Sequence, residues 1–426
     1  MWIDVRLYPL RALGLLAALA VACKDPPPKP RVHIDAGRGE PELWGPRDAA
    51  PPPIVDAAPP ADAGKPTGSR ALDGGEGASA CRLLYGPEEQ PFRGPAALRP
   101  RDGYLELVLN EAGKPKTLRV PIAPLAAPPP KPAAPVSPYA VTWPACALGG
   151  KYVYCLGSAG AIVRTPLAGG EGKEVAKGRP STRIAAAPLA GEHSVVGYLA
   201  ARKTSEGSTL EAWAAVDAEP PTKLSEDGSG ATWLDLAPRA ESVVALYLDA
   251  RAAMTPVHSR HIAWAGGKAE VRKDAVVYVG GPPDRGITGT LAVLSPNDVF
   301  GLVPIAEDVY KFSMLSVRIE DPPKEDMGAV PSPYPNGLDP APIATSGPFL
   351  VRVRPENAQP TSPRVLELGR LDTKGGFTSL GVISTGRPYA DLAMATDSLG
   401  ALWILYGDAT SSFLERRLCP APSKSP

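Results

Sequence analysis

YADLAMATDSLGALWILYG, residues 389–407, is the stretch that decides the fold. It contains an apolar run typical of a β-strand, a short turn with Asp397 and Gly400, and a second apolar run that includes Trp403. Two β-type runs joined by a turn predict a hairpin rather than a helix.

The same pattern recurs about every 45 to 55 residues along the chain. The clear copies are residues 139–155, 183–200, 232–249, 289–305 and 389–407, and the weaker ones are residues 94–110 and 341–355. A repeat of this period, built from hairpins, predicts the blades of a β-propeller. The count gives seven blades, and six or eight stay open because the first and sixth copies are the least certain.

The predicted fold class is therefore all-β, with a single propeller over residues 81–419. No stretch after residue 23 keeps apolar residues at helical spacing over three turns, so helix is expected to be scarce. Two Pro-rich segments are interpreted as connections. Residues 121–138 would join the first two blades, and residues 320–342 would form a long loop after the third strand of the fifth blade.

Residues 1–22 have the pattern of an export signal. Arg6 and Arg11 supply positive charge, and residues 12–22 form an apolar run that is too short to span a bilayer. The segment Ala20-Val21-Ala22-Cys23 resembles the bacterial lipobox, in which a small residue precedes a cysteine that receives the lipid. Ala20 stands where Leu is most common, and the segment also suits ordinary signal peptidase, so simple secretion is the alternative.

Residues 23–80 are rich in Pro, Ala, Asp and Gly, without sustained apolar periodicity. Such a segment cannot bury enough apolar surface to offset its chain entropy, so we predict a disordered tether anchored through a lipid on Cys23. Residues 420–426 are predicted to be a disordered tail. The expected location is the bacterial cell envelope, lipid-anchored and extracytoplasmic, with a secreted soluble form as the alternative.

The four remaining cysteines predict two disulfides, because an even number in an exported chain is normally oxidised. Free buried thiols are the alternative. The last repeat supplies three strands, at 390–396, 401–406 and 412–418, and residues 82–85 are predicted to complete that sheet. Antiparallel pairing would place Cys419 beside Cys81.

Cys146 and Cys155 belong to one predicted hairpin. If Gly150-Lys151 is a two-residue loop, the two cysteines face each other directly, within bridging range. This disulfide would reinforce one blade, whereas the disulfide between Cys81 and Cys419 would close the whole ring.

Motifs that carry chemistry are few. The sequence lacks the serine-elbow, zinc-protease and phosphate-loop patterns, as well as the closely spaced cysteine pairs of zinc sites. His258 and His261, three residues apart, are interpreted as hydrogen-bonded or solvated rather than as a metal pair, and His193 is expected to be exposed in a turn. The acidic residues Glu320, Asp321, Glu325 and Asp326 match no calcium loop, and a solvated loop is favoured over a Ca²⁺ site.

The segment Asp397-Ser398-Leu399-Gly400-Ala401-Leu402-Trp403 resembles the D-x-x-G-x-L-W turn of several bacterial propeller families. The resemblance implies that Asp397 caps backbone N–H groups, Gly400 relieves the turn sterically and Trp403 packs between blades. A ligand contact is the alternative. Asn297-Asp298 is expected to do the same in the fifth repeat. Residues 81–98 together with the tether are similar to uncharacterised propeller lipoproteins of high-GC bacteria, a likeness that carries no activity.

The function stays open between two classes. Lys plus Arg and Asp plus Glu both number 45, which does not favour a nucleic-acid partner. The favoured hypothesis is a monomeric, non-catalytic propeller without cofactor or metal, which presents a binding face to a protein, peptide or glycan. The alternative is a propeller hydrolase or lactonase with a carboxylate-bound metal at the central channel. An inward-facing cluster of Asp, Glu, Asn or His around the channel mouth would favour the enzyme. A channel lined by small and apolar residues would favour the binding platform.

Overall fold

The structure is a computed structural model of the whole chain. It describes residues 80–420, except for 125–140, 142, 206, 250–254, 273–274, 281–288, 309–310, 321–329, 334–342, 357–362, 387–388, 390 and 408–409. The predicted export signal, Cys23, the tether and most of the predicted tail lie outside the described residues.

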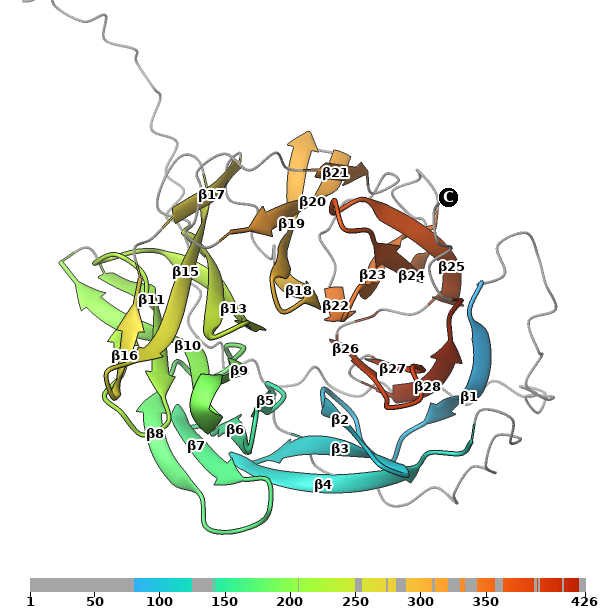
Figure 1. Cartoon of the computed structure of the whole chain (residues 1–426), viewed down its shortest axis with the longest axis horizontal. Coiled ribbons are helices and arrows are strands. Elements are labelled where there is room, and N and C mark those ends of the chain that lie inside the picture. The colour runs from blue at the N-terminus through green and yellow to red at the C-terminus, as the bar shows by residue number, and fades with distance from the viewer. Residues whose placement is uncertain are drawn as a thin grey trace, which may run out of the picture. The chain divides into compact units, whose positions relative to one another are not determined.

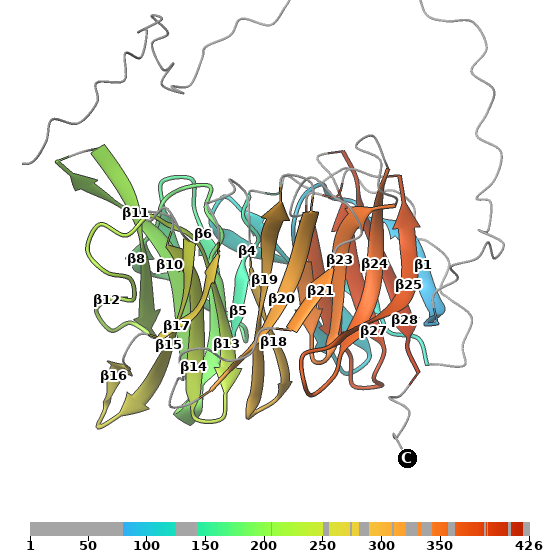
Figure 2. The same cartoon turned by 90° about the horizontal axis from the view of Figure 1, so that it is seen from above.

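Seven antiparallel sheets stand around a common axis and form a seven-bladed β-propeller (Figure 1). The first strand of each sheet lies nearest the axis, and the following strands lie progressively further out (Figure 1). Seen from the side, the sheets stand next to one another around the ring (Figure 2). In the described part of the chain, the one helical element is a turn of 3-10 helix, η1, at Ala190–Glu192. The predicted seven blades and scarcity of helix are confirmed.

We number the blades along the chain. Blade 1 contains β2 Ala97–Arg101, β3 Tyr104–Glu111 and β4 Lys114–Pro121. Blade 2 contains β5 Ala147–Gly149, β6 Tyr152–Leu156, β7 Ala161–Pro166 and β8 Lys173–Lys177. Blade 3 contains β9 Ala185–Leu189, β10 His193–Thr204, β11 Gly207–Val216 and β12 Thr222–Lys223.

Blade 4 contains β13 Ala231–Arg239, β14 Ser242–Asp249, β15 Thr255–Ala265, β16 Lys268–Val271 and β17 Ala275–Gly280. Blade 5 contains β18 Thr290–Ser295, β19 Asp298–Asp308, β20 Lys311–Ile319 and β21 Val330–Pro333. Blade 6 contains β22 Ile343–Ser346, β23 Phe349–Pro355, β24 Arg364–Leu371 and β25 Phe377–Thr385. Blade 7 contains β26 Asp391–Thr396, β27 Leu402–Gly407 and β28 Ser412–Leu418, with β1 Arg82–Glu89 at its outer edge.

The core lies between the blades. The second strands of blades 4 and 7, β14 and β27, are buried at every position. A strand with a neighbouring blade on each face has no solvent side, so its sequence is a continuous apolar run rather than an alternating one. One cluster joins Val195 and Leu199 of blade 3 to Val243 and Tyr247 of blade 4. Contacts of this kind hold each sheet to the next.

The ring is closed by strand β1, which comes from the N-terminal side of the domain. It pairs antiparallel with β28, with Arg82 opposite Leu418. The disulfide between Cys81 and Cys419 follows directly, with Cα atoms 4.1 Å apart. The predicted closing strand and its disulfide are therefore both present, although β1 extends four residues beyond the predicted Arg82–Tyr85.

The second predicted disulfide is also present, within blade 2. Strands β5 and β6 pair Gly149 with Tyr152, which leaves Gly150-Lys151 as a two-residue loop, and Gly150 has a φ of +59°. The pairing continues to Ala147 with Tyr154, and directly beyond it Cys146 is bonded to Cys155, with a Cα separation of 4.4 Å.

One expected loop contains a strand. Residues 320–342 were expected to be a loop because of their prolines, but β21 lies within them and pairs with β20, Val330 opposite Ser316 and Pro333 opposite Ser313. An outermost strand needs no donors on its free side, so it tolerates proline. The expected connection at 121–138 is described only to residue 124, and β4 already includes Pro121.

Candidate functional site

A pocket of about 230 Å³ opens at the end of the ring where the innermost strands begin. We call it the axial pocket. Its walls are residues 95–97 of blade 1, 143–147 of blade 2, 183–184 before blade 3, and 391–393 with Leu405 of blade 7. Most of these residues are proline, alanine, isoleucine or leucine. The axial pocket therefore has an apolar wall and a small set of polar groups, as ligand sites usually do.

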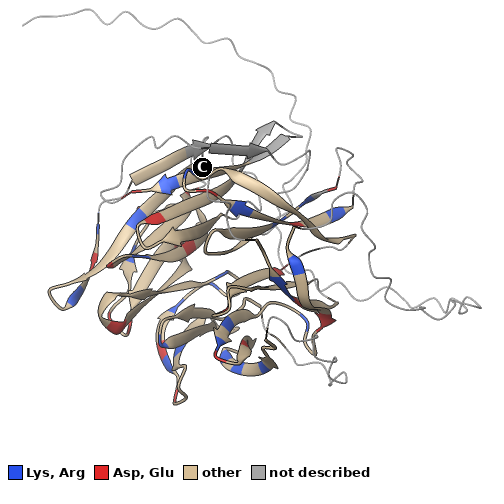
Figure 3. Cartoon of the chain, turned by 45° about the vertical axis from the view of Figure 1, so that its right-hand side comes forward, with Lys and Arg blue, Asp and Glu red and all other residues tan. Residues whose placement is uncertain are grey.

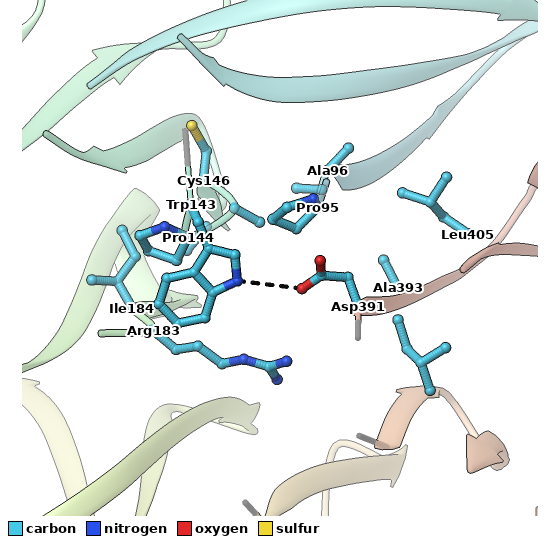
Figure 4. Close-up of a pocket in the computed structure, with 14 residues that line it drawn as sticks. Pro95, Ala96, Trp143, Pro144, Cys146, Arg183, Ile184, Asp391, Ala393 and Leu405 are labelled. Carbon is cyan, nitrogen blue, oxygen red and sulfur yellow. Dashed lines mark hydrogen bonds between the residues drawn. The ribbon is translucent and has the colours of Figure 1, made fainter. Parts of the chain in front are cut away.

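Three polar side chains converge on the axial pocket (Figure 4). Trp143 is 41% exposed, although large aromatic side chains are normally buried. Its indole Nε1–H donates to Oδ1 of Asp391 over 3.4 Å, which joins the segment before β5 to the first residue of β26. Arg183 extends past the indole from the segment before β9 (Figure 4). The three side chains come from three different blades.

The charges of this site are close but not joined. Among the described residues, no hydrogen bond or ion pair is formed by the guanidinium of Arg183, which is exposed. Burial raises the pKa of Asp391, an effect that the charge of Arg183 and the Trp143 hydrogen bond only partly offset. Arg183 is therefore a cation with no ion-pair partner among the described residues, beside a carboxylate that water solvates poorly.

A second carboxylate lies within the electrostatic reach of Arg183. Asp235 of β13 accepts hydrogen bonds from the hydroxyl of Thr290 over 2.9 Å and from the backbone N–H of Leu291 over 2.8 Å. Burial raises the pKa of Asp235, against the opposing effect of these hydrogen bonds and of Arg183. The Asp235 carboxylate already has hydrogen-bond partners. It therefore acts on this end of the ring through its charge and not as a free hydrogen-bond acceptor.

The segment that carries Trp143 is fixed from two sides. Asn110 of β3 donates to the carbonyl oxygen of Pro144 over 2.9 Å and to that of Leu156 over 3.0 Å. The disulfide between Cys146 and Cys155 holds the same segment to β6. This disulfide therefore positions one wall of the axial pocket, in addition to reinforcing its hairpin.

The turn at Asp397 lies at the opposite end of the strands, between β26 and β27. Oδ1 of Asp397 accepts from the backbone N–H of Leu399 and of Ala401, each over 3.0 Å. Oδ2 accepts from the indole of Trp403 over 3.1 Å and from Nε of Arg416 over 2.8 Å. Gly400 has a φ of +78°, which favours glycine.

Trp403 and Arg416 connect this turn to blade 1. Trp403 is 1% exposed and packs in a cluster with Tyr85, Leu105 and Leu107. Arg416 also donates to the carbonyl oxygen of Ala123 over 2.6 Å. Both carboxylate oxygens of Asp397 have protein partners. We therefore interpret this turn as part of the seam, where β1 pairs with β28 to close the ring, and not as a ligand site.

The expectation of an exposed His193 is wrong. Its ring is half-buried, hydrogen-bonded through Nδ1 to Oδ2 of Asp217 over 2.6 Å, and stacked on Trp264 of blade 4 with ring centroids 3.9 Å apart. The φ of Asp217 is +49°, which turns its carboxylate back toward Ser194 and Arg164. A neighbouring blade covers the turn, an arrangement that local sequence does not reveal.

The other two histidines in the described part of the chain have separate partners. His258 stacks on Tyr247, with ring centroids 5.1 Å apart, whereas Nε2 of His261 lies 3.1 Å from the carbonyl oxygen of Glu320. The expected role of Asn297-Asp298 is also wrong in detail. The hydroxyl of Ser295 accepts from the backbone N–H of Asp298, whose carboxylate accepts from that hydroxyl and pairs with Arg318.

Metal-type clusters and membrane-spanning helices are both absent from the described residues. Nowhere in that part of the chain do three or more His, Cys, Asp or Glu side chains gather closely enough to hold a metal ion. Of the acidic residues at 320–326, Asp321, Glu325 and Asp326 lie outside it. No helix among these described residues is long and apolar enough to cross a membrane. Charges of both signs are interspersed along the strands in the view of Figure 3.

Sequence reasoning did not single out the three polar residues of the axial pocket. The available signal was their common position, because Trp143, Arg183 and Asp391 all lie at or just before the first strand of a repeat. Residues there face the same end of the axis. A comparison of the repeats in register would have brought them together.

No protein-family model matches the sequence, and no curated protein matches it. The chain is similar in fold to several solved propellers. A GH93 α-L-arabinofuranosidase of Fusarium graminearum has 11% identity and a TM-score of 0.40, covering 80% of this chain and 97% of that one. A subtype N10 neuraminidase-like protein of A/little yellow-shouldered bat/Guatemala/060/2010 has 12% identity and a TM-score of 0.38, with coverages of 64% and 93%. AofleA from Arthrobotrys oligospora has 13% identity and a TM-score of 0.38, with coverages of 64% and 81%. No function follows from likenesses at this level.

Proposed function

We propose that this chain is a non-catalytic propeller of the bacterial cell envelope, which binds a protein, peptide or glycan partner at the end of the ring that contains the axial pocket. The proposal is supported by the exposed Trp143 beside Arg183, whose guanidinium has no partner in the described part of the chain, at a pocket built by several blades. An exposed aromatic ring and an unpaired guanidinium are the side chains most often found at the centre of binding interfaces.

The two disulfides support a location outside the cytoplasm, because such bonds form and persist mainly in oxidising compartments. We further propose that Cys23 carries diacylglycerol and tethers the domain to a membrane. Replacing Cys23 by Ser should release the protein from the membrane fraction and remove the mass of the lipid. Retention in that fraction with unchanged mass would contradict the anchor.

The binding proposal is tested by photo-crosslinking in cells, with the full chain. A photoreactive aromatic amino acid replaces Trp143 in one variant and Leu399 in another. Leu399 is a matched control, because its side chain is 47% exposed and lies in the turn at the other end of β26. We expect a defined adduct from position 143, absent from position 399.

Two further results would decide against the proposal. Equal adducts from both positions would mean that exposure alone determines crosslinking. An adduct at position 399 alone would place the partner at the other end of the ring. Adding Arg183→Ala to the position 143 variant should weaken its adduct, since the guanidinium would no longer contact the partner.

A further inference from the structure

The axial pocket holds two opposite charges with a space between them. Arg183 acts electrostatically on Asp391, yet no ion pair joins the two side chains. In the described part of the chain, Asp391 has one hydrogen bond, from Trp143, and its second carboxylate oxygen has none. A ligand that places a cation against Asp391 and an acceptor against Arg183 would satisfy both groups.

We propose that the axial pocket binds the free amino terminus of a peptide segment of the partner, an inference that rests on the proposed function at this end of the ring. The terminal ammonium contacts the carboxylate of Asp391. The first carbonyl oxygen of the peptide accepts from Arg183. The first side chain lies against the apolar wall formed by Ile184 and Leu392.

Charge supports an amino terminus over a carboxyl terminus. Among the described residues, the carboxylates of Asp391 and Asp235 both lie within the electrostatic reach of one guanidinium, that of Arg183, so acidic groups outnumber basic ones in this set. A cationic group is attracted to such a site, whereas a terminal carboxylate would add a charge of the same sign. The amino terminus is therefore the end of a peptide that complements the pocket.

Trp143 supports an ammonium over a neutral group. Its ring is exposed beside the carboxylate, and an ammonium near an aromatic face is attracted by the electrostatic field of the ring. The indole N–H also fixes one oxygen of Asp391 and leaves the other oxygen for the ligand. A neutral sugar would stack on the same ring, but it brings no charge for the partly desolvated carboxylate.

The size of the axial pocket limits what enters it. Its volume of about 230 Å³ is smaller than the pockets that take drug-sized ligands, which span roughly 300–1,000 Å³. One terminal residue fits this space, and the rest of the segment lies on the face of the ring. An internal segment has no ammonium on its backbone and leaves Asp391 without a counter-charge.

The test uses the full chain and two short peptide amides built from alanine and leucine, one with a free and one with an acetylated amino terminus. Binding is followed by tryptophan fluorescence and calorimetry. The free peptide should bind, and acetylation should weaken binding roughly tenfold or more, because it removes the charge and one hydrogen-bond donor. In Asp391→Asn, the free peptide should bind no better than the acetylated one binds to the unmodified protein.

Glu192→Gln is the matched control, since Glu192 is an exposed acid in the turn after β9, away from the axial pocket. It should keep the full preference for the free amino terminus. Equal binding of both peptides, no binding of the free peptide, or tighter binding of N-acetylglucosamine than of the free peptide would overturn the inference. If the photo-crosslink at position 143 persists in that case, the proposed function stands and only the ligand class is wrong. If the crosslink is also absent, both the inference on the ligand and the proposed function are wrong.

Discussion

Removing the disulfide at the seam should destabilise the propeller far more than removing the disulfide within blade 2. The two variants are the double substitutions Cys81→Ala with Cys419→Ala, and Cys146→Ala with Cys155→Ala. The first disulfide joins residues 338 apart, and the second joins residues 9 apart. Loop-closure entropy then gives upper limits on the stabilisation by each disulfide of about 6 kcal/mol at the seam and about 3 kcal/mol in blade 2.

The structure also indicates where the seam variant should open first. Without the disulfide, β1 is held to the ring by its pairing with β28, by the buried side chain of Tyr85, and by Phe92 shortly after the strand. Amide exchange in β1 and β28 should therefore become faster than exchange in β14, whose side chains are all buried. The variant in blade 2 should instead change the fluorescence of Trp143, because it releases the segment beside Cys146.

The assay is urea unfolding of the full chain, with hydrogen exchange resolved by strand. A difference of about 3 kcal/mol in the free energy of unfolding is expected between the two variants. Equal losses, or a larger loss from the variant in blade 2, would refute the closure of the ring by β1. Unchanged exchange in β1 and β28 would refute it as well.

Two further predictions concern buried ion pairs. Asp397→Ala leaves Arg416 buried without its carboxylate and should lower the free energy of unfolding by about 3 to 5 kcal/mol. Asp372→Ala removes a similar but exposed turn cap and should lower it by about 1 kcal/mol. Both losses are measured by thermal or urea unfolding. A loss below about 1 kcal/mol for Asp397→Ala would contradict the role assigned to that turn. Burial alone would raise the pKa of Glu367, but the charge and hydrogen bond of Arg352 hold it below its usual 4.5. The stabilisation from this pair is therefore full above pH 4.5 and is lost as the pH falls through the folded-state pKa of Glu367. Glu367→Gln should be less stable than the unmodified protein at neutral pH, and its free energy of unfolding should fall less on acidification. Parallel curves of stability against pH for the two proteins would contradict this.

The repeat and the cysteines could be predicted because local sequence determines them. Each blade begins with an apolar run and a turn, and the turn residues Gly150 and Gly400 adopt the positive φ that the sequence leads one to expect. Cys81 and Cys419 flank the two chain ends that one missing strand must join. That pairing is necessary because the blades form a closed ring. It could be predicted because the last repeat supplies three strands, which leaves one strand of its sheet missing.

The axial pocket could not be predicted in the same way, because its residues meet only through the ring. Trp143 and Asp391 are 248 residues apart and contact each other across blade 1. The same limit explains the error at His193, whose partner Trp264 comes from the next blade. Strand β21 was missed for a different reason, since its prolines resemble a loop and only its place at the edge of blade 5 makes them compatible with pairing.

We propose that the partner contacts the end of the ring around the axial pocket. The most direct measurement is hydrogen–deuterium exchange of the full chain in cell-envelope membranes, compared with the same chain purified alone. With the partner present, we expect slower exchange at residues 95–97, 143–147, 183–184 and 391–393, and no change in the turn at 397–400. Slower exchange at 397–400 or in the outer strands, with these four segments unchanged, would contradict it.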